Sequence, residues 1–389
     1  MLNSLPEDNK ICNNLLSALK QPAEVDLLLE TELNNEFIES PYQSPPFEKY
    51  RISPLGIAER KYSGKKRLIV DLSAPHNSQC PSINSLIDKE MCSLSYVKID
   101  DAIKSIEGYG RCAILCKTDI CNAFKLLPIK PEQMPYFMVK WKGQYYVYTR
   151  LVFGSRSSPK IFDNLSRAIC WIAKNNYGIE SIFHLLDDFL TVQAPTSNGD
   201  RTMALITLIF NKLKIPISPS KTVGPTTQLE YLGVILDSEK LQARLPDDKV
   251  QRIIEFITTF LHKKAVTKRE VLQLLGHFQI ASRVILPGRS FVSYLINVST
   301  TVKELHHYVH LSKDCKEDLS MCLKFLKDLN GISMFYDDIY TSSEDMELFT
   351  DASSTKGFSG YYKKKWFCNK WPEQIPETAS MASANCILS

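Results

Sequence analysis

The stretch Ile182-Phe-His-Leu-Leu-Asp187-Asp188-Phe-Leu-Thr-Val192 places two adjacent aspartates inside an apolar run. The residues on either side of the pair favour β structure, so the stretch predicts two short strands joined by a tight turn that carries the carboxylates. Burial of two like charges side by side is unfavourable unless a cation neutralises them. The alternative is a solvated turn, because Asp is a common turn residue. A functional interpretation therefore requires a partner carboxylate elsewhere in the chain.

Asp119 is that partner, since it closes the apolar segment Cys112-Ala-Ile-Leu-Cys-Lys-Thr-Asp119. If this strand and the hairpin are neighbours in one antiparallel sheet, three carboxylates converge. Such a cluster suits Mg²⁺, a hard cation that prefers oxygen ligands and leaves room for water and substrate phosphates. Two such ions about 3.5–4 Å apart serve phosphoryl transfer, because one activates the attacking hydroxyl and the other neutralises the leaving group.

Length and composition indicate a globular protein of two to four compact units, with 389 residues, 44% hydrophobic and 23% charged. No stretch approaches the roughly 18 apolar residues of a membrane span, and the N-terminus lacks a basic-then-apolar signal pattern. We therefore predict an intracellular protein, cytoplasmic and/or nuclear, without a membrane partner. The 11 cysteines include no CxxC pair, so most are expected to be core residues in a reducing compartment.

Charge is unevenly spread around the formal net value of +4. The first forty residues are acidic, with only Lys10 and Lys20 as bases, so the remainder is basic. A basic body suits a polyanionic partner. Residues 1–45 end in the proline-containing stretch Ser40-Pro-Tyr-Gln-Ser-Pro-Pro46, and we expect them to form an appendage or leader, partly helical or disordered.

Periodicity and turn signals predict the remaining elements. The expected elements are a strand over 67–72, a hairpin of 136–141 and 144–148, a helix over 158–176 with proline in its first turn, a helix near 200–213, a hairpin ending in 229–237, a capping box at Thr267-Lys-Arg-Glu270, and helices from about 245 to 328.

Five segments then resemble the motifs of reverse transcriptases, in the order of that family. Lys117-Thr-Asp119-Ile-Cys-Asn-Ala-Phe124 resembles polymerase motif A, and Phe153-Gly154-Ser-Arg-Ser-Ser158-Pro159-Lys-Ile-Phe162 resembles motif B. Leu185-Leu186-Asp187-Asp188 resembles the catalytic motif C, and Leu232-Gly233 resembles the primer-grip hairpin. Gly64-Lys-Lys-Arg67-Leu-Ile-Val-Asp71-Leu72-Ser73 resembles the fingers strand that contacts the incoming triphosphate.

The resemblance implies a metal site with named ligands. Asp119 and Asp187 would ligate both of two Mg²⁺ ions, with Mn²⁺ as an alternative, and Asp188 would complete the acidic cluster. The backbone carbonyl of Ile120 would add a further ligand.

The resemblance to reverse transcriptases also implies a nucleotide-binding site. Phe124 lies where the family places an aromatic gate under the sugar, so a 2′-hydroxyl would clash and deoxynucleotides would be preferred. Arg67, together with Lys66, would hold triphosphate oxygens through charge-assisted hydrogen bonds. Phe153 would line the nucleotide, and Gly154 would let the backbone approach it.

Lys221 occupies a place where a lysine could protonate the departing pyrophosphate. For each of these residues a structural role is the alternative: Lys221 as a solvated turn lysine, Phe124 as a core aromatic, and Arg67 as a surface cation.

The segments beyond the central region narrow the resemblance. Residues 271–289 look like the thumb and connection of DIRS-type retrotransposon polyproteins, which pair a reverse transcriptase with a ribonuclease H domain. Glu347-Leu-Phe-Thr-Asp351-Ala and Lys365-Trp-Phe-Cys-Asn-Lys-Trp371-Pro look like the opening strands of that ribonuclease H. After Asp351 only Glu373 and Glu377 remain as acids, so we expect a truncated domain without ribonuclease H activity of its own.

The resulting expectation is an α+β right-hand polymerase with fingers, an antiparallel-sheet palm and a helical thumb or connection, followed by a partial ribonuclease H-like α/β piece. The expected boundaries are an acidic N-terminal appendage at 1–45, fingers and palm at 46–243, thumb or connection at 244–335, and the truncated segment at 340–389. The expected partners are an RNA template, a DNA primer, their RNA–DNA hybrid and deoxynucleoside triphosphates.

Two other functions stay open at the level of sequence. A catalytically inactive retroelement remnant that only binds nucleic acid is favoured by Leu185, which stands where the family usually has tyrosine. The second alternative is a metal nuclease that acts on RNA–DNA hybrids through Asp351, provided that the ribonuclease H domain is completed.

Overall fold

The computed structural model describes residues 8–39, 41–59, 64, 66–76, 79–281, 284, 293–329, 332–334, 343–353 and 357–370. The chain forms two compact units. The first comprises Met1–Lys98, Cys116–Val192 and Asn198–Pro225, and the second comprises Ile99–Leu115, Gln193–Ser197 and Thr226–Ser389. Two units agree with the number expected from the length of the chain.

A four-stranded sheet with the order β10-β5-β9-β8, which we call the central sheet, falls largely within the first unit. It consists of β5 (Ile114–Asp119), β8 (Ile182–Leu185), β9 (Asp188–Gln193) and β10 (Val223–Thr226). β8 and β9 form an antiparallel hairpin in which Leu185 pairs with Asp188, and β5 is the other neighbour of β9. The predicted hairpin and the predicted adjacency of the two acidic strands are both confirmed.

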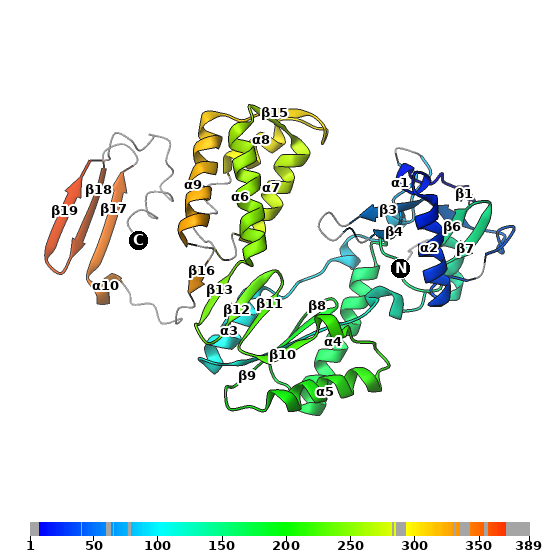
Figure 1. Ribbon diagram of the computed structural model, residues 1–389, viewed down its shortest axis with the longest axis horizontal. Helices are drawn as coiled ribbons and strands as arrows, with labels where there is room; N and C mark the ends of the chain where they lie inside the picture. The colour runs from blue at the N-terminus through cyan, green and yellow to red at the C-terminus, as the bar shows by residue number, and fades with distance from the viewer. Residues whose placement is uncertain are drawn as a thin grey trace. The chain divides into compact units, whose positions relative to one another are not determined.

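Two helices accompany this sheet, α4 (Ser158–Tyr177) and α5 (Gly199–Lys212), and α4 packs on β8 (Figure 1). α4 begins with proline in its first turn, where the missing N–H has no helical partner to lose, and ends at Gly178 in the left-handed conformation. The Asn198 side chain caps α5 by accepting a hydrogen bond from the Arg201 N–H. The two helix predictions are confirmed.

The rest of the first unit carries short strands, helices and 3-10 turns. β1 (Lys10–Ile11), β2 (Arg51–Ser53), β6 (Met138–Trp141) and β7 (Gln144–Val147) form one sheet, and β3 (Leu55–Glu59) pairs with β4 (Lys66–Val70). The 3-10 turns are η1 (Asn84–Leu86), η2 (Glu90–Cys92), η3 (Ala123–Leu126), η4 (Pro131–Tyr136) and η5 (Pro219–Lys221). The predicted β6–β7 hairpin turns through Lys142 and Gly143, both at positive φ, as a tight two-residue turn requires.

Residues 8–39 differ from the expected appendage, because they pack into the first unit. They form α1 (Leu16–Leu19) and α2 (Pro22–Asn34), and Ala18, Val25 and Leu29 are buried in its main core. Three of their acidic side chains form ion pairs: Glu24 with Lys66, Asp26 with Lys142 and Glu32 with Lys125. The acidic composition indicated solvation, but specific partners far along the chain neutralise the charges.

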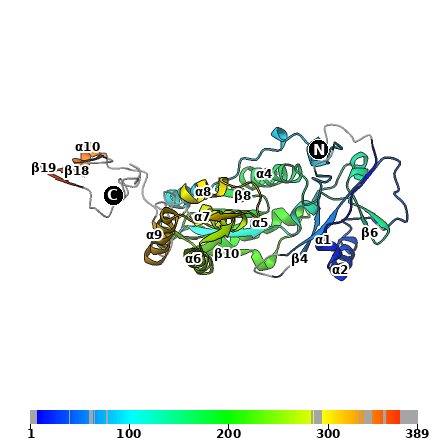
Figure 2. The ribbon, with the colours of Figure 1, turned by 90° about the horizontal axis from the view of Figure 1, so that it is seen from above.

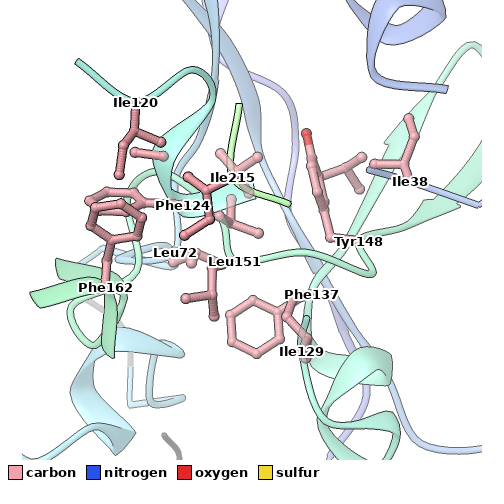
Figure 3. Packing of buried hydrophobic residues seen from close by; sticks show 14 of the residues in the cluster. Ile38, Leu72, Ile120, Phe124, Ile129, Phe137, Tyr148, Leu151, Phe162 and Ile215 are labelled. Atoms are coloured by element: carbon pink, nitrogen blue, oxygen red, sulfur yellow. The ribbon is translucent and has the colours of Figure 1, made fainter. Parts of the chain in front are cut away.

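The main hydrophobic core of the first unit joins side chains from distant parts of its sequence. Ile38, Phe124, Tyr148, Phe162 and Ile215 all belong to it, and the close view shows them around one packed interior (Figure 3). Burial of such side chains contributes about 25 cal/mol per Å² of apolar area. The elements that carry the acidic residues are therefore fixed by the same core.

Over its described residues, the second unit has a helical part and three sheets. α6 (Asp247–His262), α7 (Lys268–Ala281), α8 (Ser293–Thr300) and α9 (Lys313–Leu329) pack together with the pair β14 (Ala265–Thr267) and β15 (Tyr308–His310) (Figures 1 and 2). β11 (Gln228–Tyr231), β12 (Val234–Asp237), β13 (Gln242–Arg244) and β16 (Ile332–Met334) form a sheet, and α3 (Ile99–Tyr109) belongs to the same unit.

Local sequence signals of the second unit are confirmed. The Glu270 carboxylate accepts from the Thr267 N–H at 2.8 Å, and the Glu270 N–H donates to Thr267 Oγ1 at 3.3 Å, so the predicted capping box opens α7. The hairpin ending in Asp237 corresponds to β11 and β12.

The last described part is a three-stranded antiparallel sheet of β17 (Leu348–Ser353), β18 (Gly357–Tyr362) and β19 (Lys365–Asn369), preceded by α10 (Ser343–Met346). The two segments expected to form opening strands, 347–352 and 365–372, fall on β17 and β19 as far as they are described. Residues 371–389, on which part of the ribonuclease H prediction falls, lie outside the described residues. Among the helices that the structure describes, none combines the length and the apolar character needed to cross a membrane.

Asp318 on α9 gives the second unit a pH-dependent stability. Burial, together with the Asp314 and Glu317 carboxylates, raises the pKa of Asp318 from 3.8 to about 6. An acid whose pKa is raised by folding binds its proton more tightly in the folded state, so its destabilising effect is absent below about pH 4 and complete above about pH 6. We expect Asp318→Asn to raise the melting temperature at pH 7.5 and to change it little at pH 4. Thermal unfolding at both values tests this, with the exposed Glu304→Gln as the control; an equal shift at both would contradict it.

Candidate active site

Asp119, Asp187 and Asp188 meet where β5 ends and β9 begins, at one end of the two inner strands of the central sheet. Asp119 ends β5 and is 4% exposed, and the Ile120 N–H donates to the Asp187 carbonyl at 3.1 Å. Burial raises the pKa of Asp187, and the Asp119 carboxylate raises it further. Burial also raises the pKa of Asp188, with both other carboxylates adding to the effect. The three acids therefore share one electrostatic environment.

The turn between β8 and β9 has a fixed conformation. Leu186 adopts a φ of 54°, in the left-handed region, and its carbonyl accepts a hydrogen bond from Ser166 Oγ of α4 at 2.8 Å. Ser166 is fully buried. A helix that lies beside the hairpin thus holds the turn that presents Asp187, and nothing in the local sequence pattern indicated this role for Ser166.

Two lysines neutralise the acidic cluster. Lys221 Nζ, at the end of η5, donates to both oxygens of Asp119 at 2.8 and 2.9 Å. Lys117 Nζ lies 3.4 Å from Asp188 Oδ1. Lys221 was predicted as a site residue, whereas Lys117 was not, although it stands two residues before Asp119 and strand alternation places both on one face.

The donor set of the cluster suits a hard divalent cation, since it consists of carboxylate oxygens. Asp188 Oδ1 is buried, and the Lys117 ammonium at 3.4 Å partly offsets its charge, so a bound cation would share this oxygen with Lys117. In the part of the chain that the structure describes, no three His, Cys, Asp or Glu side chains are arranged to hold a metal ion. Lys221 occupies both Asp119 oxygens, and metal binding would require their release.

Arg67 and Lys66 lie on β4 but differ in their surroundings. Arg67 is exposed, and its charge lowers the pKa of Asp187 against the raising effect of burial. Lys66 Nζ forms an ion pair with Glu24 of α2 at 3.3 Å. Of the two predicted triphosphate contacts, only Arg67 is thus shown to act electrostatically on the acidic cluster.

Phe124, Phe153 and Phe162 form an aromatic group beside the cluster. The ring centroid of Phe124 lies 4.8 Å from that of Phe153 and 5.6 Å from that of Phe162. Phe124 is buried, whereas Phe153 is 44% exposed. Asn122, at the start of η3, adopts a φ of 53°, so the chain turns tightly between β5 and the short helix that carries Phe124.

The backbone conformation and the surroundings of position 154 both require glycine. Its φ is 107°, and a Cβ at this position would lie 2.6 Å from the Val70 carbonyl of β4. Asn84 holds the same loop, because its Nδ2 donates to the Gly154 carbonyl and its Oδ1 accepts from the Arg156 N–H, both at 2.9 Å. The structure shows a close approach to β4; the predicted approach to a nucleotide stays a prediction.

We expect Gly154→Ala to destabilise the first unit by about 2–4 kcal/mol, because it adds both a positive-φ penalty and a backbone clash. Gly178→Ala is the matched control, since Gly178 has a φ of 68° but no atom within 4 Å of its would-be Cβ. Urea unfolding measures both. Equal losses in the two variants would show that the contact with Val70 is relieved without cost.

His184, immediately before the hairpin turn, belongs to a buried polar network that the sequence did not indicate. Its Nε2 lies 3.2 Å from Asp163 Oδ1 and its Nδ1 lies 3.4 Å from Cys170 Sγ. Burial lowers the pKa of His184 and raises that of Cys170 to about 12, so at neutral pH the thiol is not a nucleophile. The network ties β8 to α4.

The remaining predicted residues lie in the second unit. Leu232 and Gly233 form the turn between β11 and β12 at φ values of 49° and 83°, and the Gly233 carbonyl accepts from Lys249 Nζ at 2.9 Å. Asp351 lies on β17 opposite Ser359 of β18. Their predicted roles as primer grip and residual ribonuclease H acid stay predictions.

Comparison with known protein families identifies the central region. Residues 45–236 match the family described as reverse transcriptase (RNA-dependent DNA polymerase). The chain contains a reverse transcriptase domain. This region includes the acidic cluster, the aromatic group and β3–β4, so the prediction of a reverse transcriptase domain is confirmed.

Two curated relatives place the domain among Pol polyproteins. The Gag-Pro-Pol polyprotein of Human T-cell leukemia virus 2 is 24% identical over 173 residues, which are 42% of this chain and 11% of that protein. The retrovirus-related Pol polyprotein from transposon opus of Drosophila melanogaster is 21% identical over 204 residues, which are 52% of this chain and 18% of that protein. The reverse transcriptase domain is of the retroviral and retrotransposon Pol type, and the matches span less than a fifth of each relative.

Solved structures of foamy viral protease-reverse transcriptase share the fold. The one in complex with double-stranded DNA has a TM-score of 0.61 at 16% identity and covers 96% of this chain and 59% of that one. The one in complex with an RNA/DNA hybrid has a TM-score of 0.61 at 14% identity and covers 100% of this chain and 48% of that one. At such low identity the likeness concerns the fold alone, and the predicted polymerase fold is confirmed.

Proposed function

We propose that this chain is an RNA-directed DNA polymerase that adds deoxynucleotides to a primer 3′-hydroxyl. The observation that carries the proposal is the convergence of Asp119, Asp187 and Asp188 at one end of the neighbouring strands β5 and β9, within the region that matches the reverse transcriptase family. Three adjoining carboxylates, of which Asp119 is buried and Asp187 and Asp188 are half-buried, are unfavourable for folding, and a cation site is the simplest reason to keep them.

In this proposal Asp119 and Asp187 hold both of two Mg²⁺ ions, Asp188 completes the site, and the Ile120 carbonyl adds a ligand; Mn²⁺ is the alternative ion. When bound, the ions supply activation of the primer hydroxyl and neutralisation of the leaving pyrophosphate. Their predicted ligands are supported by the mutual pKa effects of the carboxylates.

The chain's own side chains perform the remaining steps of the proposal. Arg67 binds triphosphate oxygens with its planar guanidinium, which suits two hydrogen bonds at once. Phe124, whose position the rings of Phe153 and Phe162 support, excludes the 2′-hydroxyl of a ribonucleotide. Lys221 protonates the pyrophosphate oxygen as it departs.

The substrates and origin belong to the proposal as well. The proposed partners are an RNA template, a DNA primer and their hybrid, supported by the nucleic acids named for the foamy viral structures. A DIRS-type retrotransposon origin is supported by the sequence of residues 271–289, of which 271–281 and 284 are described.

Primer extension tests the proposal. The full chain, supplied with Mg²⁺ or Mn²⁺, an RNA template, an annealed DNA primer and deoxynucleoside triphosphates, is expected to elongate the primer. Failure with both ions, by protein that unfolds cooperatively and binds the primer–template, would favour the inactive remnant instead. Cleavage of the RNA strand that disappears in Asp351→Asn would favour the nuclease.

A further inference from the structure

Lys125 is a buried cation directly beside the predicted sugar gate. It follows Phe124 in η3, and its side chain is only 6% exposed. Burial lowers the pKa of Lys125, against the raising effect of Glu32. A lysine with its ammonium in the protein interior needs a partner, because a buried unpaired charge is strongly unfavourable.

Glu32 of α2 supplies that partner from a distant part of the sequence. Its Oε2 lies 2.5 Å from Lys125 Nζ, and its side chain is 20% exposed. The ammonium also lies 4.2 Å from the ring centroid of Tyr148, which is 1% exposed, and 5.6 Å from that of Phe37. Three side chains thus enclose one ammonium group.

The backbone around this ion pair is equally constrained. The Thr149 N–H donates to the Phe37 carbonyl at 3.1 Å, and Ile38 forms a bridge with Tyr148. Tyr148, Ile38 and Phe124 belong to the same core (Figure 3). Lys125 therefore cannot change its position without moving either η3 or its neighbours.

The one-turn helix η3 is consequently held at two adjacent residues. On one side the ring of Phe124 packs against Phe153 and Phe162, and on the other Lys125 is fixed by Glu32. If Glu32 lost its charge, the ammonium would be drawn toward water, since removal of one partner of a buried pair leaves the other uncompensated. The neighbouring Phe124 would shift with it.

We propose that the Glu32–Lys125 pair positions Phe124 and thereby sets how strictly the enzyme rejects ribonucleotides. The inference rests on the proposed polymerase function. It makes α2, in the acidic N-terminal segment, a determinant of substrate specificity although it carries no group that touches the substrate. Glu32 and Lys125 are positioning residues.

The test compares discrimination, the ratio of kcat/KM for a deoxynucleotide to that for the matching ribonucleotide, among full-length variants. This ratio is unaffected by the fraction of folded enzyme, so a purely structural loss leaves it unchanged. Phe124→Val is expected to lower it most, and Glu32→Gln to lower it about tenfold, which corresponds to about 1.4 kcal/mol. The double variant Glu32→Gln/Lys125→Met removes the uncompensated charge and is expected to recover most of the ratio.

Lys142→Met is the matched control, because it breaks another ion pair of α2, that of Lys142 with Asp26 at 2.6 Å, where both side chains are about half exposed. It is expected to keep the wild-type ratio. Hydrogen exchange provides a readout that does not need activity. The Lys125 N–H donates to the Asn122 carbonyl at 2.8 Å, and exchange over residues 123–127 is expected to speed up in Glu32→Gln and not in Lys142→Met.

The outcomes separate the two proposals. If the wild type extends no primer, the polymerase function is overturned. Faster hydrogen exchange at 123–127 in Glu32→Gln would then still support the role of the Glu32–Lys125 pair in holding η3. A wild-type ratio in Glu32→Gln, together with a reduced ratio in Phe124→Val, overturns the positioning role. Equal losses in Glu32→Gln and Lys142→Met overturn it as well, since they would reflect general loosening of α2.

Discussion

Asp187→Asn is expected to reduce nucleotide addition on an RNA template by at least about a thousandfold, which corresponds to about 4 kcal/mol of transition-state stabilisation. The amide keeps the shape of the side chain but removes the charge that a metal ligand needs. The turn itself does not depend on that charge, because Leu186 and Ser166 hold it through the backbone. Single-nucleotide addition under saturating substrate measures the effect.

Stability is expected to change in the opposite direction. Burial and the Asp119 carboxylate raise the pKa of Asp187, so its charged form destabilises the folded protein at neutral pH. Asp187→Asn should therefore melt at the same temperature as the wild type or higher while it is inactive, as expected for a residue kept for function at the expense of stability. The exposed Glu180→Gln, in the same unit, is the control and should retain activity. A variant that is inactive because it melts earlier would contradict this interpretation.

The acidic hairpin was predictable because its signals are local. Apolar, β-prone residues on both sides of Asp187-Asp188 permit few arrangements other than a hairpin, and the pairing of Leu185 with Asp188 follows. The prediction that Asp119 joins the Asp187–Asp188 pair required a further assumption, that β5 and β9 are neighbouring strands. The resemblance to the family motifs supported that assumption. The capping box at Thr267 is another local signal that the structure reproduces.

The N-terminal segment was not predictable in the same way. Its acids match a solvated or disordered composition, yet Glu32 and Asp26 pair with Lys125 and Trp141, about a hundred residues further along the chain. A single sequence contains no signal for such pairs, because each partner alone resembles a surface residue. The contact of Lys117 with the acidic cluster, by contrast, could have been predicted from the sequence. Strand alternation places Lys117 on the same face as Asp119, and its positive charge is attracted to the carboxylates.

Lys221→Met is expected to slow nucleotide addition by about a hundredfold, within the range for loss of a general acid. Lys221 Nζ already contacts both oxygens of Asp119, so its reach into the cluster is established, and its side chain is 55% exposed. Without the ammonium, nothing at this position competes for the Asp119 oxygens. The Mg²⁺ concentration at half-maximal rate should therefore fall even though the maximal rate falls too.

Lys221→Arg separates the two roles of this residue. The guanidinium keeps a positive charge and can donate to both Asp119 oxygens, but with a pKa above about 12 it does not release a proton during the reaction. If Lys221 acts as the acid, Lys221→Arg is nearly as slow as Lys221→Met, while its half-maximal Mg²⁺ concentration stays close to that of the wild type. If the charge alone matters, Lys221→Arg is as fast as the wild type, and the acid that protonates pyrophosphate must be sought elsewhere. The pairing of a slow rate with an unchanged metal requirement is the result that only proton transfer from Lys221 explains.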